Sequence, residues 1–166
     1  NLGDNTLLGV EDLSTTFGAY NNPGCTTPMI LSQTGSSATD YTQLFKFESL
    51  SDGDSANKEI KLGISNIKKA GSIAGSDYGA FDVIVREYGD TDKRPNILES
   101  FANCNLDPDS SNYVGRKIGD MKSSFDTSTS KIKVEGDYAV KSKYIRLASI
   151  NNKIKGKTLS VNLLPF

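Results

Sequence analysis

The stretch from Gly79 to Met121 constrains the fold of this 166-residue chain more than any other segment. Phe81, Val83 and Val85 recur at a period of two, with the charged Asp82 and, beyond Ile84, Arg86 on the other face, which is typical of a strand with one buried face. The acidic, turn-forming segment Tyr88–Pro95 follows, and Ile97–Phe101 resumes the apolar run. The pattern therefore predicts two strands joined by a polar turn.

A short helix is predicted to follow these strands, over Ser111–Met121. The preceding Asp109–Ser111 supplies side-chain oxygens that can accept the free N–H groups of a first helical turn. Val114, Ile118 and Met121 lie at i, i+4 and i+7, so they form one apolar stripe for packing on a sheet.

Strand-like alternation recurs on both sides of this stretch, and the segments between are rich in turn-forming residues. Further strands are predicted within Pro28–Ser32, Leu44–Glu48, Ile60–Ile64, Lys131–Glu135, Lys143–Leu147 and Leu159–Leu163. Turns and loops are predicted at Asn21–Gly24, Thr34–Asp40, Ser51–Ser55, Ala70–Gly79, Lys122–Ser130 and Asn151–Gly156.

The fold class that follows is α+β, mainly antiparallel β, with about seven to nine strands and one short helix packed on the sheet. Strands are expected to pair antiparallel because no helix lies between most of them to make a parallel crossover. The core is expected to contain Phe81, Val83, Val85, Ile60, Leu62, Ile145 and Leu147.

The chain divides into a lead-in over residues 1–20 and a single mainly-β domain over residues 21–166. Glycines at positions 3, 9 and 18 oppose a stable helix in the lead-in. We expect it to be extended, anchored by Leu7, Leu8 and Phe17. A domain near 150 residues buries about 70% of its unfolded surface, so a core without disulfides is feasible.

The composition and the distribution of apolar residues argue against two classes of partner, nucleic acids and membranes. The chain has 19 Lys and Arg against 20 Asp and Glu, a net charge of −1, so it has no basic excess to neutralise nucleic-acid phosphates. It has no apolar run long enough for a transmembrane helix. We expect neither a nucleic-acid nor a membrane partner.

The chain contains no histidine, which is the commonest general base and metal ligand. It also has no Walker-type phosphate loop, since Gly71–Gly75 lacks the Lys and Ser or Thr that would complete one. Its two cysteines, Cys25 and Cys104, are expected to be reduced thiols rather than a disulfide. We therefore expect no enzyme activity, no catalytic or metal-binding residues and no cofactor.

Three groups of closely spaced oxygens could be considered for calcium. They are Asp107–Asn112, Asp52 with Asp54, and Asp90 with Asp92. A dedicated calcium loop needs more ligands and a terminal bidentate Glu. We interpret the first group as helix-capping residues and the other two as solvated turns.

Two further sets of residues bear on sugar chemistry. Asp82 and Glu87 are the nearest carboxylate pair for glycoside hydrolysis, although a charge pair of Asp82 with Arg86 is the favoured interpretation. Four tyrosines could line a sugar-binding surface or lie at the margin of the core: Tyr78, Tyr88, Tyr113 and Tyr144.

The order and spacing of several motifs resemble the tail sheath proteins of contractile bacteriophages, over roughly half the chain. The motifs are Phe81–Arg86, Leu98–Phe101, Asn105–Pro108, Asn112–Asp120 and Ser142–Arg146, with Leu164–Phe166 similar to the segment that leaves this module. The resemblance implies a structural subunit of the sheath around the tail tube, contributing to contraction for genome delivery. It implies a location in the virion after assembly in the host cytoplasm.

Sheath subunits of this type are much longer, and the region that forms their inner wall has no counterpart in these 166 residues. We therefore expect a fragment of a larger subunit whose partners are other sheath subunits, and the tail tube through the missing inner domain. The isolated fragment is expected to be a monomer. The alternative function is a β-rich module that recognises surface carbohydrate.

Overall fold

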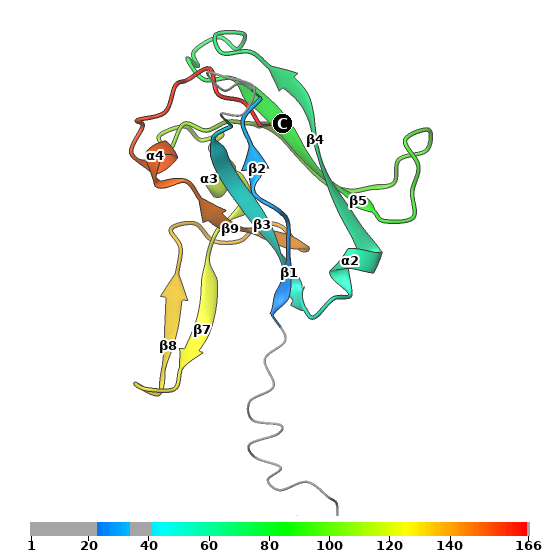
Figure 1. Ribbon diagram of the computed structural model, residues 1–166, viewed down its shortest axis with the longest axis vertical. Helices are drawn as coiled ribbons and strands as arrows, with labels where there is room; N and C mark the ends of the chain where they lie inside the picture. Colours follow the sequence, from blue (N-terminus) through cyan, green and yellow to red (C-terminus); the bar gives the residue numbers. More distant parts are fainter. Residues whose placement is uncertain (1–22, 34–40, 166) are drawn as a thin grey trace, which may run out of the picture.

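A computed structural model describes residues 23–33 and 41–165 (Figure 1). The predicted lead-in and the whole of the predicted Thr34–Asp40 loop lie outside the described residues. The described residues form nine strands and three short helices. These are β1 (Gly24–Thr26), β2 (Ile30–Leu31), β3 (Gln43–Asp52), α2 (Ala56–Glu59), β4 (Ile60–Lys68), β5 (Ala80–Glu87), β6 (Ile97–Cys104), α3 (Val114–Ile118), β7 (Lys122–Asp126), β8 (Lys131–Glu135), β9 (Ile145–Ile150) and α4 (Asn152–Lys155).

The strands form two sheets and a separate ribbon. In the first sheet β3 is central, with β1 and β2 along one side and β9 along the other. The second sheet has the order β4-β5-β6, and β7 and β8 form the two-stranded ribbon. Every pairing between these strands is antiparallel, so the predicted mainly antiparallel α+β class is confirmed.

The core lies where the two sheets face each other. Phe45 of β3 packs edge-on against Phe47 at a centroid distance of 5.4 Å and stacks on Phe81 of β5 at 5.9 Å. Among the seven predicted core residues, five are buried, and Ile60 and Leu62 are partly buried against that core. The buried five are Phe81, Val83, Val85, Ile145 and Leu147.

The predicted helix over Ser111–Met121 is shorter than expected. Its N-cap residue is Tyr113, which makes no side-chain capping bond, and Gly119 ends the helix with a φ of 100°. The Ser110 hydroxyl instead accepts hydrogen bonds from Asn105 and from the backbone N–H of Asn112, so it shapes the loop before the helix. Two residues of the predicted stripe, Val114 and Ile118, are buried, whereas Met121 lies beyond the helix and is 37% exposed.

Several boundaries differ from the prediction where local pattern is weak. β1 begins at Gly24 and β3 continues to Asp52, so strands extend into the turns predicted at Asn21–Gly24 and Ser51–Ser55. Two more helices occur: α2 follows the second of these turns, and α4 lies in the predicted Asn151–Gly156 turn. β7 lies in the predicted Lys122–Ser130 loop, and the predicted strand Leu159–Leu163 is not one. β7 pairs with β8, the next strand along the chain, and the backbone N–H of Leu163 donates to the carbonyl oxygen of Ser160, which closes a turn.

Candidate functional site

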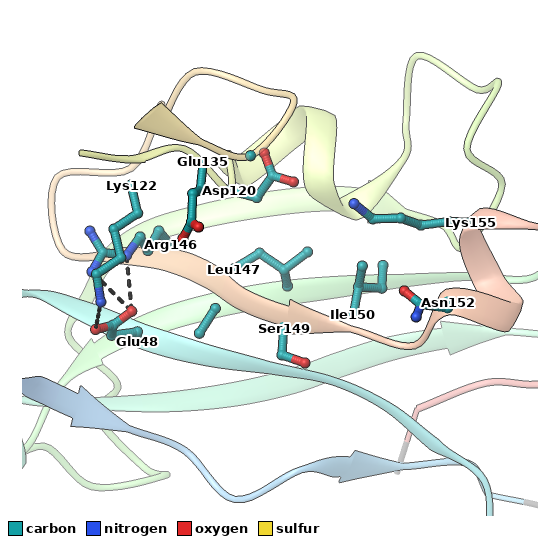
Figure 2. A pocket seen from close by; sticks show the side chains of 12 residues that line it. Glu48, Asp120, Lys122, Glu135, Arg146, Leu147, Ser149, Ile150, Asn152 and Lys155 are labelled. Atoms are coloured by element: carbon teal, nitrogen blue, oxygen red, sulfur yellow. Dashed lines mark hydrogen bonds and ion pairs between the residues drawn. The ribbon is translucent and has the colours of Figure 1, made fainter. Parts of the chain in front are cut away.

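A charged cleft lies between β9 and the base of the β7–β8 ribbon (Figure 2). Its volume is about 260 Å³. Glu48 of β3 lies at one end of the cleft with Lys122 and Arg146, and Lys155 of α4 lies at the other. The cleft therefore joins the ribbon, the first sheet and α4.

Glu48 ties the ribbon to the first sheet. Its carboxylate lies 3.0 Å from the Lys122 ammonium and 2.9 Å from the Arg146 guanidinium, and its side chain is only 9% exposed. Burial alone would raise the pKa of Glu48, but hydrogen bonds from Lys122 and Arg146 outweigh burial and lower that pKa. The oxygens of this carboxylate are already engaged by two cations, so this end of the cleft is arranged to hold structure together.

The ribbon has a second anchor at Asp120. Its Oδ1 accepts hydrogen bonds from the backbone N–H groups of Asp137 and Tyr138, at 2.9 and 2.7 Å. Gly136 beside it has a φ of 98°, and a Cβ there would lie 2.5 Å from the carbonyl oxygen of Asp120. This close approach requires glycine, and it determines the angle at which the ribbon leaves the body.

The ribbon exposes large apolar side chains. Phe125 is opposite Ile132 and Ser123 is opposite Val134 in the strand register, so these four side chains share one face. Phe125, Ile132 and Val134 are 64%, 73% and 55% exposed. Exposed apolar clusters of this kind mark interaction sites.

A second apolar surface lies between the two sheets, along the strands β2 and β4. We call it the β2–β4 groove; it has a volume of about 340 Å³ and Phe47 contributes to its lining. A neighbouring hollow of about 230 Å³ continues it along β1 and shares Thr27 and Leu62 with it. The groove is lined chiefly by Pro28, Met29, Ile30, Leu62, Gly63 and Ile64.

Asp90 is not in a solvated turn, contrary to the prediction. Its side chain is 2% exposed and lies 2.7 Å from the Arg86 guanidinium and 2.6 Å from the Lys61 ammonium. The hydrogen bonds from Arg86, followed by those from Lys61 and the backbone of Asn96, hold the pKa of Asp90 well below its ordinary value of 3.8. The exposed Asp92 also pairs with Arg86, at 2.9 Å, so Asp90 is the buried centre of a cluster that closes the loop between β5 and β6.

The Asp82–Arg86 charge pair is also a wrong prediction. Asp82 accepts hydrogen bonds from the side chain of Asn66 and from the backbone N–H of Asn103. Arg86 instead forms ion pairs with Asp90 and Asp92. Asp82 and Glu87 are five residues apart on β5, which is about 16 Å, whereas glycosidase carboxylates lie within about 10 Å of each other.

The other two oxygen-rich groups form hydrogen bonds and ion pairs within the protein. Lys157 forms ion pairs with both Asp107 and Asp109. Asp54 pairs with Lys58 on the surface at 3.2 Å. Among the described residues, no group of three or more Cys, Asp or Glu side chains is arranged to hold a metal ion.

The four tyrosines do not form a row. Tyr113 is buried beside Tyr138, and its hydroxyl has no hydrogen-bond partner among the described residues. Tyr78 and Tyr144 line separate small hollows near α4 and α2, and Tyr88 is exposed in the loop after β5.

Both cysteines are free thiols. Cys25 is half-buried and donates to the carbonyl oxygen of Gly53 at 3.0 Å. Cys104 is buried, and burial raises the pKa of its thiol to about 11, so it stays protonated at neutral pH.

Sequence reasoning therefore missed the residues that matter most here: Glu48, Asp120 and the apolar face of the ribbon. The only signal for the ribbon was the alternation at Ile132 and Val134. Within the described residues, no helix is both long and apolar enough to cross a membrane. No family model, curated protein or solved structure matches this chain.

Proposed function

We propose that this chain is a structural module of a contractile phage tail sheath subunit, and that its function is assembly. In this proposal its partners are other sheath subunits, and the tail tube is contacted by another part of the subunit. The protein would be located in the tail of the virion. The contact surfaces, rather than a catalytic centre, would carry the function.

The observation that carries the proposal is that the sheath-like motifs contact one another in space. Glu99, in the motif on β6, accepts hydrogen bonds from the Ser142 hydroxyl at 2.5 Å and from the backbone N–H of Lys143 at 2.9 Å. Ser142 in turn accepts from the backbone N–H groups of Tyr144 and Ile145 at 3.1 Å. Two motifs that are more than forty residues apart are therefore joined directly.

The same holds for the motifs around α3. The backbone N–H of Asn105 donates to the carbonyl oxygen of Asn112 at 2.9 Å, and the N–H of Val114 donates to the carbonyl of Asn105 at 3.0 Å. Gly119 at the end of this motif accepts from the backbone N–H of Leu147 on β9 at 2.9 Å. The residues on which the resemblance rests therefore lie together in one part of the fold, as the proposal requires.

Electron microscopy of the complete gene product that carries this chain tests the proposal. We expect rings or hollow tubes with a regular helical repeat. A gene product that stays monomeric under all conditions, together with specific binding on a glycan array, would refute the sheath proposal and favour carbohydrate recognition.

A further inference from the structure

We propose that the β7–β8 ribbon of one copy docks by its apolar face in the β2–β4 groove of a second copy. This inference rests on the proposed assembly function and names the surfaces that would carry it. Four observations lead to it. They are the different chemistry of the two ribbon faces, the apolar lining of the groove, the location of ribbon and groove on opposite sides of β3, and the apolar area that the ribbon exposes.

The two faces of the ribbon differ in chemistry. Lys122, Lys133 and Glu135 lie on the face opposite Phe125, Ile132 and Val134, because successive side chains on a strand alternate. Lys133 and Glu135 pair with each other at 2.6 Å, and Lys122 reaches Glu48 in the body. These three charged side chains thus form their ion pairs within their own molecule, whereas the three apolar side chains stay exposed among the described residues.

The β2–β4 groove has complementary chemistry. The side chains of Ile30, Leu62 and Ile64 are partly buried against the core but still line an open hollow. β4 is an edge strand of its sheet among the described residues, so apolar side chains and backbone both border the groove. An apolar strand pair that binds in the groove would bury the parts of these three side chains that are still exposed.

The ribbon cannot reach the groove of its own molecule. β9 pairs along one side of β3, and the ribbon leaves the body near β9, whereas β1 and β2 pair along the other side of β3 (Figure 1). The residues that line the groove belong chiefly to β2, the segment before it and β4. Lys122 and Asp120 hold the ribbon at its own side. A projecting surface and a receiving surface on opposite sides of one subunit make a head-to-tail contact, which propagates into rings or helices.

The apolar area that the ribbon exposes is too small for a stable pairwise contact, so the contact would have to be repeated many times in a lattice. Three exposed side chains of this size offer on the order of 300 Å². A stable pairwise interface buries about 800 Å² on each partner. One ribbon–groove contact should therefore be weak, with a Kd on the order of millimolar for the isolated chain, and become effective only when many contacts repeat in a lattice.

Disulfide trapping in the 166-residue chain tests the contact. Cys25→Ser serves as the background because Cys25 lines the adjoining hollow, and Cys104 is buried. Chains with Val134→Cys are mixed with chains carrying Ile64→Cys at high concentration and oxidised. We expect cross-linked dimer from the mixture and only background from either variant alone.

Lys133→Cys is the matched control, since it lies beside Val134 on the charged face of the same strand. Its mixture with Ile64→Cys should give only background dimer. The proposal is overturned if this control cross-links as fast as Val134→Cys, or if Val134→Cys cross-links with itself as fast as in the mixture, which would mean that two ribbons pair with each other.

A second experiment separates this inference from the proposed function. Ile132→Lys in the complete gene product should abolish tubes while leaving Tm unchanged, because Ile132 is exposed. If the unmodified protein forms tubes and Ile132→Lys forms them equally well, the sheath proposal stands and the ribbon–groove contact is wrong. If the unmodified protein forms no tubes at all while the trapping experiment succeeds, the contact stands and the sheath proposal is wrong.

Discussion

We expect Asp90 to make the stability of the protein fall at acid pH. A group whose pKa is lowered by folding stabilises the native state fully above its ordinary pKa, here 3.8, and that contribution is lost as pH falls toward the lowered value. We therefore expect Tm to be constant from about pH 7 to about pH 5 and to fall below about pH 4. Asp90→Asn should lower Tm at neutral pH, because Arg86 and Lys61 lose a charged partner, and should flatten the decline in acid.

The decline should not vanish in that variant, because the pKa of Glu48 is lowered as well, and hydrogen bonds from Ser128 and Thr129 lower the pKa of Asp126 to about 2. Asp54→Asn is the control: Asp54 pairs with Lys58 on the open surface, so its removal should leave the pH profile unchanged. Superimposable acid profiles for Asp90→Asn and the parent would contradict the role given to Asp90. Calorimetry or circular dichroism at a series of pH values measures the effect.

Val83 tests the packing between the sheets at a single residue. It is fully buried on β5, opposite Ile64 on one side and Phe101 on the other. Val83→Ala should lower the free energy of unfolding by about 1–3 kcal/mol, through lost burial and a small cavity. Val134→Ala removes the same two methyl groups from an exposed site and should change the free energy of unfolding by less than about 0.5 kcal/mol. Equal effects in urea titrations would show that the faces of β5 are assigned the wrong way round.

At the level of elements, Gly119 determines how α3 meets the loop that leads into β9. Its φ is 100°, and a Cβ there would lie 2.3 Å from the Cα of Val140. Gly119→Ala should therefore destabilise the protein by about 1–3 kcal/mol from backbone strain alone, with the clash adding to it. Gly89→Ala is the matched control, since a Cβ at Gly89 meets nothing within 4 Å. A thermal melt of Gly119→Ala that matches the Gly89 control would mean that the close approach to Val140 does not exist.

At the level of the whole molecule, we expect the isolated chain to be a monomer at micromolar concentration. A sheath switches between two packed lattices, so its subunits should move largely as rigid bodies whose contacts are remade. In the proposed subunit we expect this module to be an outer or middle domain with lattice contacts smaller than about 800 Å². Light scattering on the purified chain measures this directly, and a stable hexamer or filament would show that the module carries strong lattice contacts itself.

The local pattern of residues is sufficient to identify the strands that face the core. Phe81 and Val83 on β5 flank the charged Asp82, and Ile145 and Leu147 on β9 flank Arg146; this period of two on a strand is a local property that needs no partner to be read. Antiparallel pairing followed from the same local information, because the connections between most strands contain no long helix. Helix length was not predictable in this way, since the capping oxygen of Ser110 was used by Asn105 and Asn112.

Which charges are buried and which apolar residues are exposed depends on contacts between segments that are distant in the chain. Asp90 and Asp92 look alike in the sequence, but only Asp90 has both Arg86 and Lys61 within reach, because β4 lies beside β5. In the ribbon, apolar residues are exposed where the pattern predicts burial. The alternation at Ile132 predicts a strand with one covered face, but no element of the described residues covers that face. Pairing across strands and the packing of sheets are long-range properties, and a local pattern specifies which face of a strand is apolar but not what lies against it.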